Sequence, residues 1–340
     1  MTSGIGLRFP SDLDAWRTWH DGRHPLRQWK TRLRPPAPLT LVHVARRGAG
    51  EPRVVAYLDS TSATTMAALV EPLNHLDESV AVVTAFDAVA QLDGPGWSST
   101  VLPTAEAPTG RAVFAGGDYL PLGALGLETS RRAGVPYVVA QHGIMTPLAP
   151  PLPPEATLLA WSQADADFWR NGRADVTTAV VGSALLHRAA RRPAGAITED
   201  RPLFLGQLHG AELPRRAVAD ATQRFWQLTG ATYRPHPSER DALSRLQHQW
   251  WQSRGMELDH SGTPLWQLDR PVASVYSTGV LEAAARGIPS WVYFSHPPIW
   301  LEDLWERYGM SPWGNEPTPN PVSAADAAPE ARVAAFLRQL

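Results

Sequence analysis

The chain has 340 residues, with 31 basic and 33 acidic side chains, and its formal net charge of −2 leaves no basic field that would favour nucleic acid as a partner. It contains no cysteine, which excludes disulfides, thiolate catalysis and cysteine-ligated zinc. No apolar run approaches the roughly 20 residues of a membrane span and no signal peptide is evident, so we expect a cytoplasmic location.

The first predicted element is a basic and aromatic helical extension over residues 1–35. Its tryptophans and leucines are interleaved with the basic residues Arg17, Arg23, Arg27, Lys30, Arg32 and Arg34. Such a segment is suited to an anionic membrane surface, which would give peripheral contact at the inner face of the plasma membrane. The alternative is a helix packed on the first domain with its arginines in water, and both interpretations stay open.

Short apolar runs then alternate with amphipathic stretches, which is typical of a doubly wound parallel sheet. Residues 36–187 form the first such domain, with strands expected at 39–45, 54–58, 80–84, 112–115, 137–141, 158–161 and 178–181. The periodicity is lost over residues 188–201, which we interpret as a linker. Residues 202–340 form the second domain, with strands expected near 203–205, 233, 272–276 and 291–294. The predicted fold is α/β, with two Rossmann-like domains that face each other across a cleft.

One βαβ unit of the first domain carries candidate catalytic residues. The strand at 112–115 is followed by Gly116, Gly117 and Asp118, and the strand ending near residue 141 is followed by His142 and Gly143. Sequential parallel strands are usually neighbours, so Asp118 and His142 should emerge side by side. An aspartate beside a histidine makes a general base. The alternative is that Asp118 caps the next helix and His142 bonds a backbone carbonyl.

The second domain has two strand-to-helix junctions with polar tips. At the first, a strand ending at Arg234 runs through His236 and Pro237 into a helix expected from Ser238 to about residue 254. At the second, an apolar strand is followed by Ser277, Thr278 and Gly279 and then by an alanine-rich helix that contains Glu282.

A helix N-terminus has free N–H groups and favours phosphate. Taken alone, His-Pro occurs by chance in a chain with 11 histidines and 32 prolines, and Ser-Thr before a helix is usually just a cap. Their occurrence together in one domain predicts a site for a phosphorylated ligand. No metal is expected, because the histidines and acidic residues do not occur at ligand spacing.

These motifs resemble the GT-B class of nucleotide-sugar-dependent glycosyltransferases over roughly residues 110–295. Residues 141–147 are similar to the His-Gly-Thr-Pro stretch of the CDP-glycerol and CDP-ribitol polyol-phosphate transferases. His236-Pro237 and Ser277-Thr278 are similar to the His-Pro and Ser-Ser/Thr motifs with which bacterial capsule sialyltransferases hold the CMP phosphate and ribose, and capsule Kdo-transferases also use CMP-sugars. UDP-N-acetylglucosamine 2-epimerases share the fold and a similar Ser-Gly-Gly-Val-x-Glu helix.

The resemblance implies an inverting, metal-independent glycosyltransferase. It would move a sugar or polyol phosphate from a nucleotide donor, cytidine-linked, to a cell-surface polysaccharide or polyol-phosphate acceptor, lipid-linked acceptors included. The phosphates would lie between His236 and Ser277-Thr278, with Arg234 as a second ligand and the ribose near Glu282.

The acceptor side would consist of Gly116, Gly117 and Gly143, with His142 as the base, tuned by Asp118. Glu212 is the next base to test. No cofactor other than the donor is expected. Two alternatives stay open: a nucleotide-sugar 2-epimerase, which needs no acceptor, and a non-catalytic partner subunit.

Overall fold

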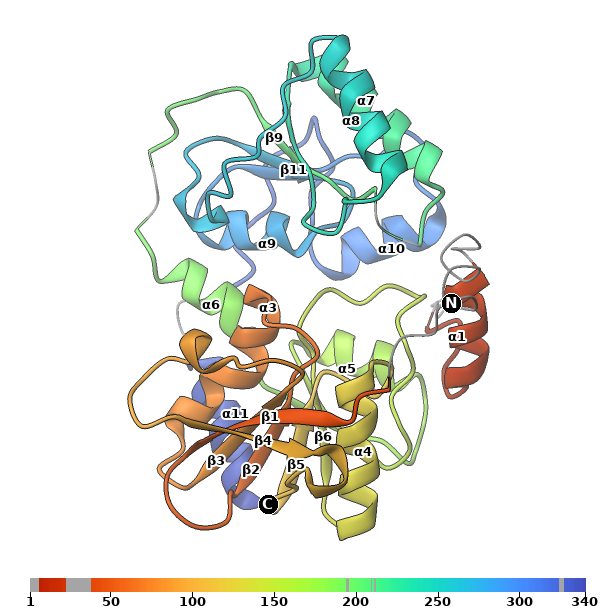
Figure 1. The fold of residues 1–340 in the computed structure, drawn as a ribbon. Coiled ribbons are helices and arrows are strands. Elements are labelled where there is room, and N and C mark those ends of the chain that lie inside the picture. Colours follow the sequence, from red (N-terminus) through yellow and green to blue (C-terminus); the bar gives the residue numbers. More distant parts are fainter. Residues whose placement is uncertain (1–5, 23–37, 194–195, 209, 211, 324–326) are drawn as a thin grey trace. The chain divides into compact units, whose positions relative to one another are not determined.

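The computed structural model describes residues 6–22, 38–193, 196–208, 210, 212–323 and 327–340. The chain divides into two compact units (Figure 1). Unit 1 comprises Met1–Leu185 and Ala327–Leu340, and unit 2 comprises Leu186–Asp326. Each unit contains its own largely parallel sheet, which confirms the predicted α/β class.

Unit 1 contains an eight-stranded sheet in the order β4-β1-β3-β2-β5-β6-β7-β8. The strands are β1 (Leu41–Arg47), β2 (Val54–Tyr57), β3 (Val80–Thr84), β4 (Ser98–Pro103), β5 (Ala112–Ala115), β6 (Tyr137–Ala140), β7 (Thr157–Ala160) and β8 (Thr177–Val180). β1 pairs antiparallel with β3 and β4, and the other pairs are parallel. β4 was not predicted from the sequence, because it is an exposed edge strand without apolar alternation.

Two hydrophobic cores cover the two faces of this sheet. Successive strand side chains point to opposite faces, so Val55 and Tyr57 of β2 enter one core while Val54 and Ala56 enter the other. The helices of unit 1 are α1 (Leu13–Gly22), α3 (Ala63–Thr65), η1 (Met66–Val70), η2 (Glu71–His75), η3 (Val89–Gln91), η4 (Thr104–Glu106), α4 (Pro121–Ala133), α5 (Gln163–Arg170) and α11 (Pro329–Gln339). The helix α6 (Ala184–Ala190) crosses into unit 2.

Unit 2 contains a four-stranded parallel sheet in the order β10-β9-β11-β12. The strands are β9 (Leu203–Leu205), β10 (Thr232–Arg234), β11 (Val272–Ser274) and β12 (Ser290–Val292). A parallel bridge between Tyr233 and Leu258 extends the sheet beyond β10. The helices are α7 (Arg215–Thr229), α8 (Ala242–Ser253), η5 (Leu265–Gln267), α9 (Thr278–Ala285) and α10 (Ile299–Arg307) (Figure 1).

Three boundaries differ from the sequence-based expectation. Residues 327–340 belong to unit 1 rather than to a second domain ending at residue 340, because Val333, Ala334 and Leu337 of α11 complete a core of that unit. The expected linker at 188–201 begins inside α6. Helix α8 begins at Ala242 rather than near Ser238, because the side chain of Asp241 caps it.

The N-terminal extension is described in part, since residues 1–5 and 23–37 lie outside the described residues. Within α1, Trp16 is buried and its indole N–H donates to the carbonyl of Leu148 at 2.8 Å. Its ring also meets Tyr119 edge-on at 5.7 Å between centroids. The described helix therefore packs on unit 1. Among the described residues, no helix is both long and apolar enough to cross a membrane.

Candidate functional site

The chain order along the sheet of unit 2 reverses at β9, since β10 lies on one side of it and β11 on the other. In open α/β sheets, ligands bind at such a reversal, outside the carboxyl ends of the strands. Here the loops after β9, β10 and β11 are joined by hydrogen bonds, because Gln207 contacts Tyr276 and Leu208 contacts Glu239. Unit 2 therefore carries its own candidate site.

The N-terminus of α9 forms one part of this site. Ser277 is the N-cap, and its hydroxyl accepts from the N–H of Gly279 at 3.1 Å. Thr278 is the first helical residue, and both hydroxyl side chains are half-buried. A Cβ at Gly279 would lie 2.6 Å from Leu205 and 2.9 Å from Leu265, so the helix start sits close against the strand. Few residues other than glycine fit that approach.

The turn after β10 presents His236, Pro237 and Ser238, all of which are exposed. The N–H of Ser238 donates to Nδ1 of His236 at 3.1 Å. Because Nδ1 accepts this bond, a neutral imidazole carries its proton on Nε2. The Nε2–H group of His236 can therefore donate a hydrogen bond to a phosphate oxygen.

Gln207 is a residue of this site that the sequence reading missed. Its Oε1 accepts from the hydroxyl of Ser274 and from the N–H of Tyr276, each at 2.9 Å. The Tyr276 hydroxyl in turn donates to Glu212 at 2.9 Å, and burial, followed by Glu212, raises the pKa of Tyr276 well above its usual value. The available signal was a polar residue two positions after the apolar run of β9.

Arg234 lies at the edge of this arrangement. Its guanidinium is paired with Asp259 and donates to the carbonyl of Thr263 at 2.8 Å. Both partners come after Leu258 in the chain. Leu258 forms a bridge with Tyr233 on the side of β10 that faces away from β9. The two partners line an open pocket of about 280 Å³ there. Arg234 is thus occupied by a protein carboxylate, and its predicted phosphate contact stays a prediction.

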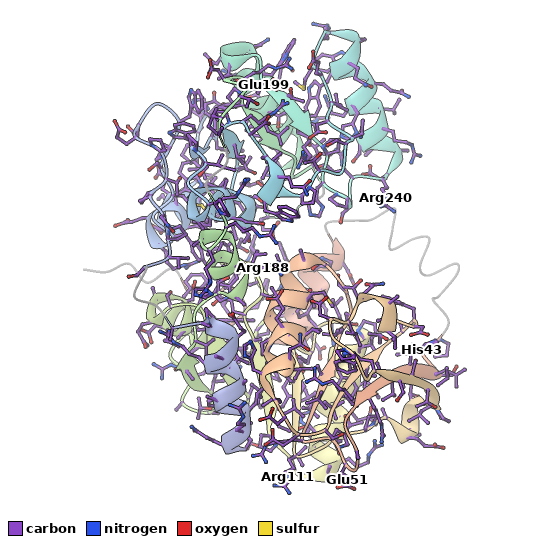
Figure 2. All side chains as sticks on the ribbon, turned by 90° about the vertical axis from the view of Figure 1, so that its left-hand side faces the viewer. His43, Glu51, Arg111, Arg188, Glu199 and Arg240 are labelled. Carbon is purple, nitrogen blue, oxygen red and sulfur yellow. The ribbon has the colours of Figure 1, made fainter. Side chains whose placement is uncertain are left out.

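Glu282 lies one turn into α9 and is half-buried. Burial raises the pKa of this carboxyl, and the positive charges of Arg188 and Arg192 oppose that effect. Arg188 lies in α6, and Arg192 lies just after that helix. Arg188 is labelled in Figure 2. A ribose hydroxyl is a chemically suitable partner for such a carboxylate.

In unit 1, the reversal of chain order lies between β2 and β5, and Gly116, Gly117 and Asp118 follow β5. Gly117 has φ of +133°, a conformation that favours glycine, and a Cβ there would touch the ring of Tyr119 at 3.0 Å. Asp118 is buried, and among the described residues its Oδ1 has no hydrogen-bond partner. Burial raises the pKa of Asp118, opposed by the charges of Arg17, Arg131 and Arg173.

His142 and Gly143 follow β6, which pairs with β5. A Cβ at Gly116 would lie 3.0 Å from the ring of His142, so the two tips are close. However, no hydrogen bond joins Asp118 to His142 among the described residues. Instead, Nδ1 of His142 lies 3.4 Å from the carbonyl of Ala140, and burial lowers the pKa of the imidazole. The role of His142 as a base tuned by Asp118 stays a prediction.

Asp59 was also missed. It follows β2, and its two carboxylate oxygens accept from the N–H groups of Leu122 and Gly123 at 2.8 and 2.9 Å. Asp59, rather than Asp118, therefore satisfies the N-terminus of α4, while burial raises its pKa. Within the described part of the chain, no group of three or more His, Asp or Glu side chains could hold a metal ion.

No protein-family model matches this chain, and no curated protein matches it by sequence. Solved structures of UDP-N-acetylglucosamine 2-epimerases resemble it. The UDP-GlcNAc 2-epimerase of Methanocaldococcus jannaschii, solved in complex with UDP-GlcNAc and UDP, has 10% identity and a TM-score of 0.53 over 84% of this chain and 98% of its own.

A second structure of that M. jannaschii enzyme has 10% identity and a TM-score of 0.48 over 85% of this chain and 100% of its own. The UDP-N-acetylglucosamine 2-epimerase of Rickettsia bellii has 10% identity and a TM-score of 0.37 over 69% and 72%. At this identity, the likeness to the first structure establishes the fold, which is of the GT-B type.

The enzyme class predicted from the sequence was wrong. We expected a glycosyltransferase, whereas the structure that shares this fold is that of a 2-epimerase, which is an isomerase. The alternative that the sequence left open, an epimerase of the same fold, has the better support.

Proposed function

We propose that this protein binds a nucleotide sugar through unit 2 and acts on that sugar as an epimerase. The fold is shared with a 2-epimerase whose crystal structure contains UDP-GlcNAc and UDP. An epimerase converts its nucleotide sugar alone, so the proposal requires no glycan or polyol-phosphate acceptor.

The single observation that carries the proposal is the set of donors at the chain reversal of unit 2. The first turn of α9 has backbone N–H groups without helical partners, and it begins with the hydroxyls of Ser277 and Thr278. His236 adds an imidazole whose Nδ1 already accepts a bond. Donors and a helix N-terminus favour an anionic diphosphate. Glu282 is the candidate for the ribose hydroxyls of the same ligand.

Inversion by proton transfer at the sugar carbon next to the anomeric carbon requires a group that removes the proton, departure of the nucleotide diphosphate from the anomeric carbon to take up the electron pair, and a group that returns a proton to the opposite face as the diphosphate adds back. Asp118 of unit 1 is the candidate for proton removal, because it is buried, no described residue forms a hydrogen bond with its Oδ1, and burial raises its pKa. A raised carboxyl pKa brings the group closer to the value that suits a general base at neutral pH.

The experiment is proton NMR of nucleotide sugars incubated with the protein in D2O. UDP-GlcNAc is tested first, and a cytidine-linked sugar is tested beside it, because the sequence resemblance favoured cytidine. The proposal predicts deuterium incorporation at one sugar carbon, the appearance of a second diastereomer, and no release of free nucleotide that depends on an added acceptor. Binding without exchange for every nucleotide sugar tested would contradict the epimerase assignment.

The variant that tests this role is Asp118→Asn, which keeps the shape of the side chain and removes the base. It should lose exchange by a factor of about 10² or more while nucleotide affinity stays unchanged. Exchange at the wild-type rate in this variant would remove Asp118 from the mechanism.

A further inference from the structure

A buried carboxylate next to the candidate nucleotide site has no role in the proposed chemistry. Glu239 follows His236 by three residues, and its side chain is completely buried, with an exposed fraction of 0%. Its Oε1 accepts from the N–H of Leu208 at 3.0 Å. Its Oε2 accepts from the hydroxyl of Tyr233 at 2.8 Å and from Nε2 of His248 at 3.0 Å. A charge this deeply buried is costly unless donors compensate it.

The same residue also closes the turn that presents His236. The backbone N–H of Glu239 donates to the carbonyl of His236 at 2.8 Å, and the N–H of Ser238 donates to its Nδ1 at 3.1 Å. Arg240, the next residue, is labelled in Figure 2 and marks this turn on unit 2. Glu239 therefore holds the histidine turn through its backbone and the loop after β9 through its side chain.

Arg215 also joins the loop after β9 to the start of α8. Arg215 donates to the carbonyl of Leu208 at 3.2 Å and to the hydroxyl of Ser244 at 2.8 Å, and it lies 3.6 Å from Asp241. Asp241 is the N-cap of α8. Glu239 and Arg215 thus fasten the loops after β9 and β10 to each other.

A close packing contact makes this link specific. A Cβ on Gly206 would lie 2.4 Å from the hydroxyl of Tyr233 and 2.7 Å from Oε1 of Glu239. Only a glycine leaves space for the carboxylate at this position. The network is therefore packed as well as hydrogen-bonded.

We propose that Glu239 is a positioning residue that holds His236 in the tautomer and orientation that donate to the phosphates of the nucleotide. This inference rests on the proposed nucleotide-binding function of unit 2. The carboxylate can accept all three of its bonds at once, whereas an amide at position 239 would turn a donor toward a donor. Loss of the link would leave the turn free to move and would weaken the phosphate contact.

The experiment compares uridine with UDP, and cytidine with CDP, by calorimetric titration of the full chain. Glu239→Gln should weaken binding of the diphosphate about tenfold or more and change nucleoside binding by less than about twofold. Glu239→Asp keeps the charge on a shorter stem and should restore part of the loss. In a His236→Ala background, Glu239→Gln should have no further effect on diphosphate affinity.

Thr222→Val is the matched control, because it removes another buried hydrogen bond of unit 2, from Thr222 of α7 to the carbonyl of Val218, and involves neither the residues of this network nor α9. It should leave the ratio of diphosphate to nucleoside affinity unchanged. Equal losses for nucleoside and diphosphate in Glu239→Gln, or additive losses with His236→Ala, would overturn the positioning role.

A readout without ligand separates this inference from the proposed function. Nitrogen-15 NMR should report the Nε2–H tautomer for neutral His236 in the wild type and a mixture of tautomers in Glu239→Gln. If no nucleotide binds the wild type, the proposed function fails while this result still decides the positioning role. An unchanged His236 tautomer in Glu239→Gln would overturn it.

Discussion

The packing around Gly206 allows a quantitative prediction for Gly206→Ala. The backbone of Gly206 is not in the left-handed region, so an alanine meets no backbone penalty there. Its Cβ would instead lie 2.4 Å from the hydroxyl oxygen and 2.7 Å from Cζ of Tyr233, a residue that is 1% exposed. The ring has no free space to move into, so the bond from its hydroxyl to Glu239 must lengthen or break.

Overpacking of a core costs about 1–3 kcal/mol, and loss of a buried hydrogen bond costs about 1–3 kcal/mol. We therefore expect Gly206→Ala to lower the free energy of unfolding of unit 2 by about 2–6 kcal/mol. For a unit of this size, that corresponds to a fall in Tm of about 5–20 °C. Differential scanning calorimetry should show the loss in the transition of unit 2.

Gly22→Ala is the control, because no described residue lies within 4 Å of the Cβ it would add. That substitution should change Tm by no more than about 1–2 °C, as is usual for surface changes. If Gly206→Ala is as stable as this control, the Tyr233–Glu239 contact is not packed as described, and Glu239 does not hold the loops after β9 and β10 together.

Three further predictions concern unit 1 and the ligand site. Burial raises the pKa of Asp118, so the stability that this residue contributes is present below its unfolded pKa of about 3.8 and is lost as the pH rises through its folded pKa. Asp118→Asn should therefore have a higher Tm than the wild type at pH 7 and an equal Tm near pH 3. Equal Tm values at both pH values would contradict this. Trp16→Ala removes a buried ring and its hydrogen bond to Leu148, and it should lower the stability of unit 1 by about 3–5 kcal/mol and expose α1 to limited proteolysis. An unchanged Tm and digestion pattern would show that α1 does not depend on this contact. A chelator such as EDTA should leave nucleotide affinity unchanged, because a helix N-terminus and His236 are expected to supply the positive potential; a loss restored by magnesium or manganese would show otherwise.

Much of the sheet structure could be predicted because it depends on local patterns. Buried strands such as β3 and β5 are continuous apolar runs bounded by polar residues, and period and length identify them. The edge strand β4 has no such pattern, since five of its six residues are exposed. The helix α11 is amphipathic in sequence, but nothing local indicates that its apolar side completes the core of unit 1.

The candidate site could be predicted only where its residues are adjacent in the chain. Ser277 and Gly279 lie in one motif, and the structure joins them by a hydrogen bond. Asp59 and Gln207 act on partners 63 and 69 residues away, across the sheet. Such contacts depend on strand order, which no local pattern encodes. The sequence could therefore suggest the phosphate-binding tips but not the residues that link them.

The central claim is that the loops around the N-terminus of α9 and the turn at His236 bind the phosphates of a nucleotide. Calorimetric titration of UDP and CDP into the wild type, His236→Ala and a Ser277→Ala/Thr278→Ala double variant tests it most directly. Each variant should remain folded and bind its nucleotide about 1–3 kcal/mol more weakly than the wild type, because charge-assisted hydrogen bonds are lost at an accessible site. Unchanged affinity in both folded variants would contradict the claim.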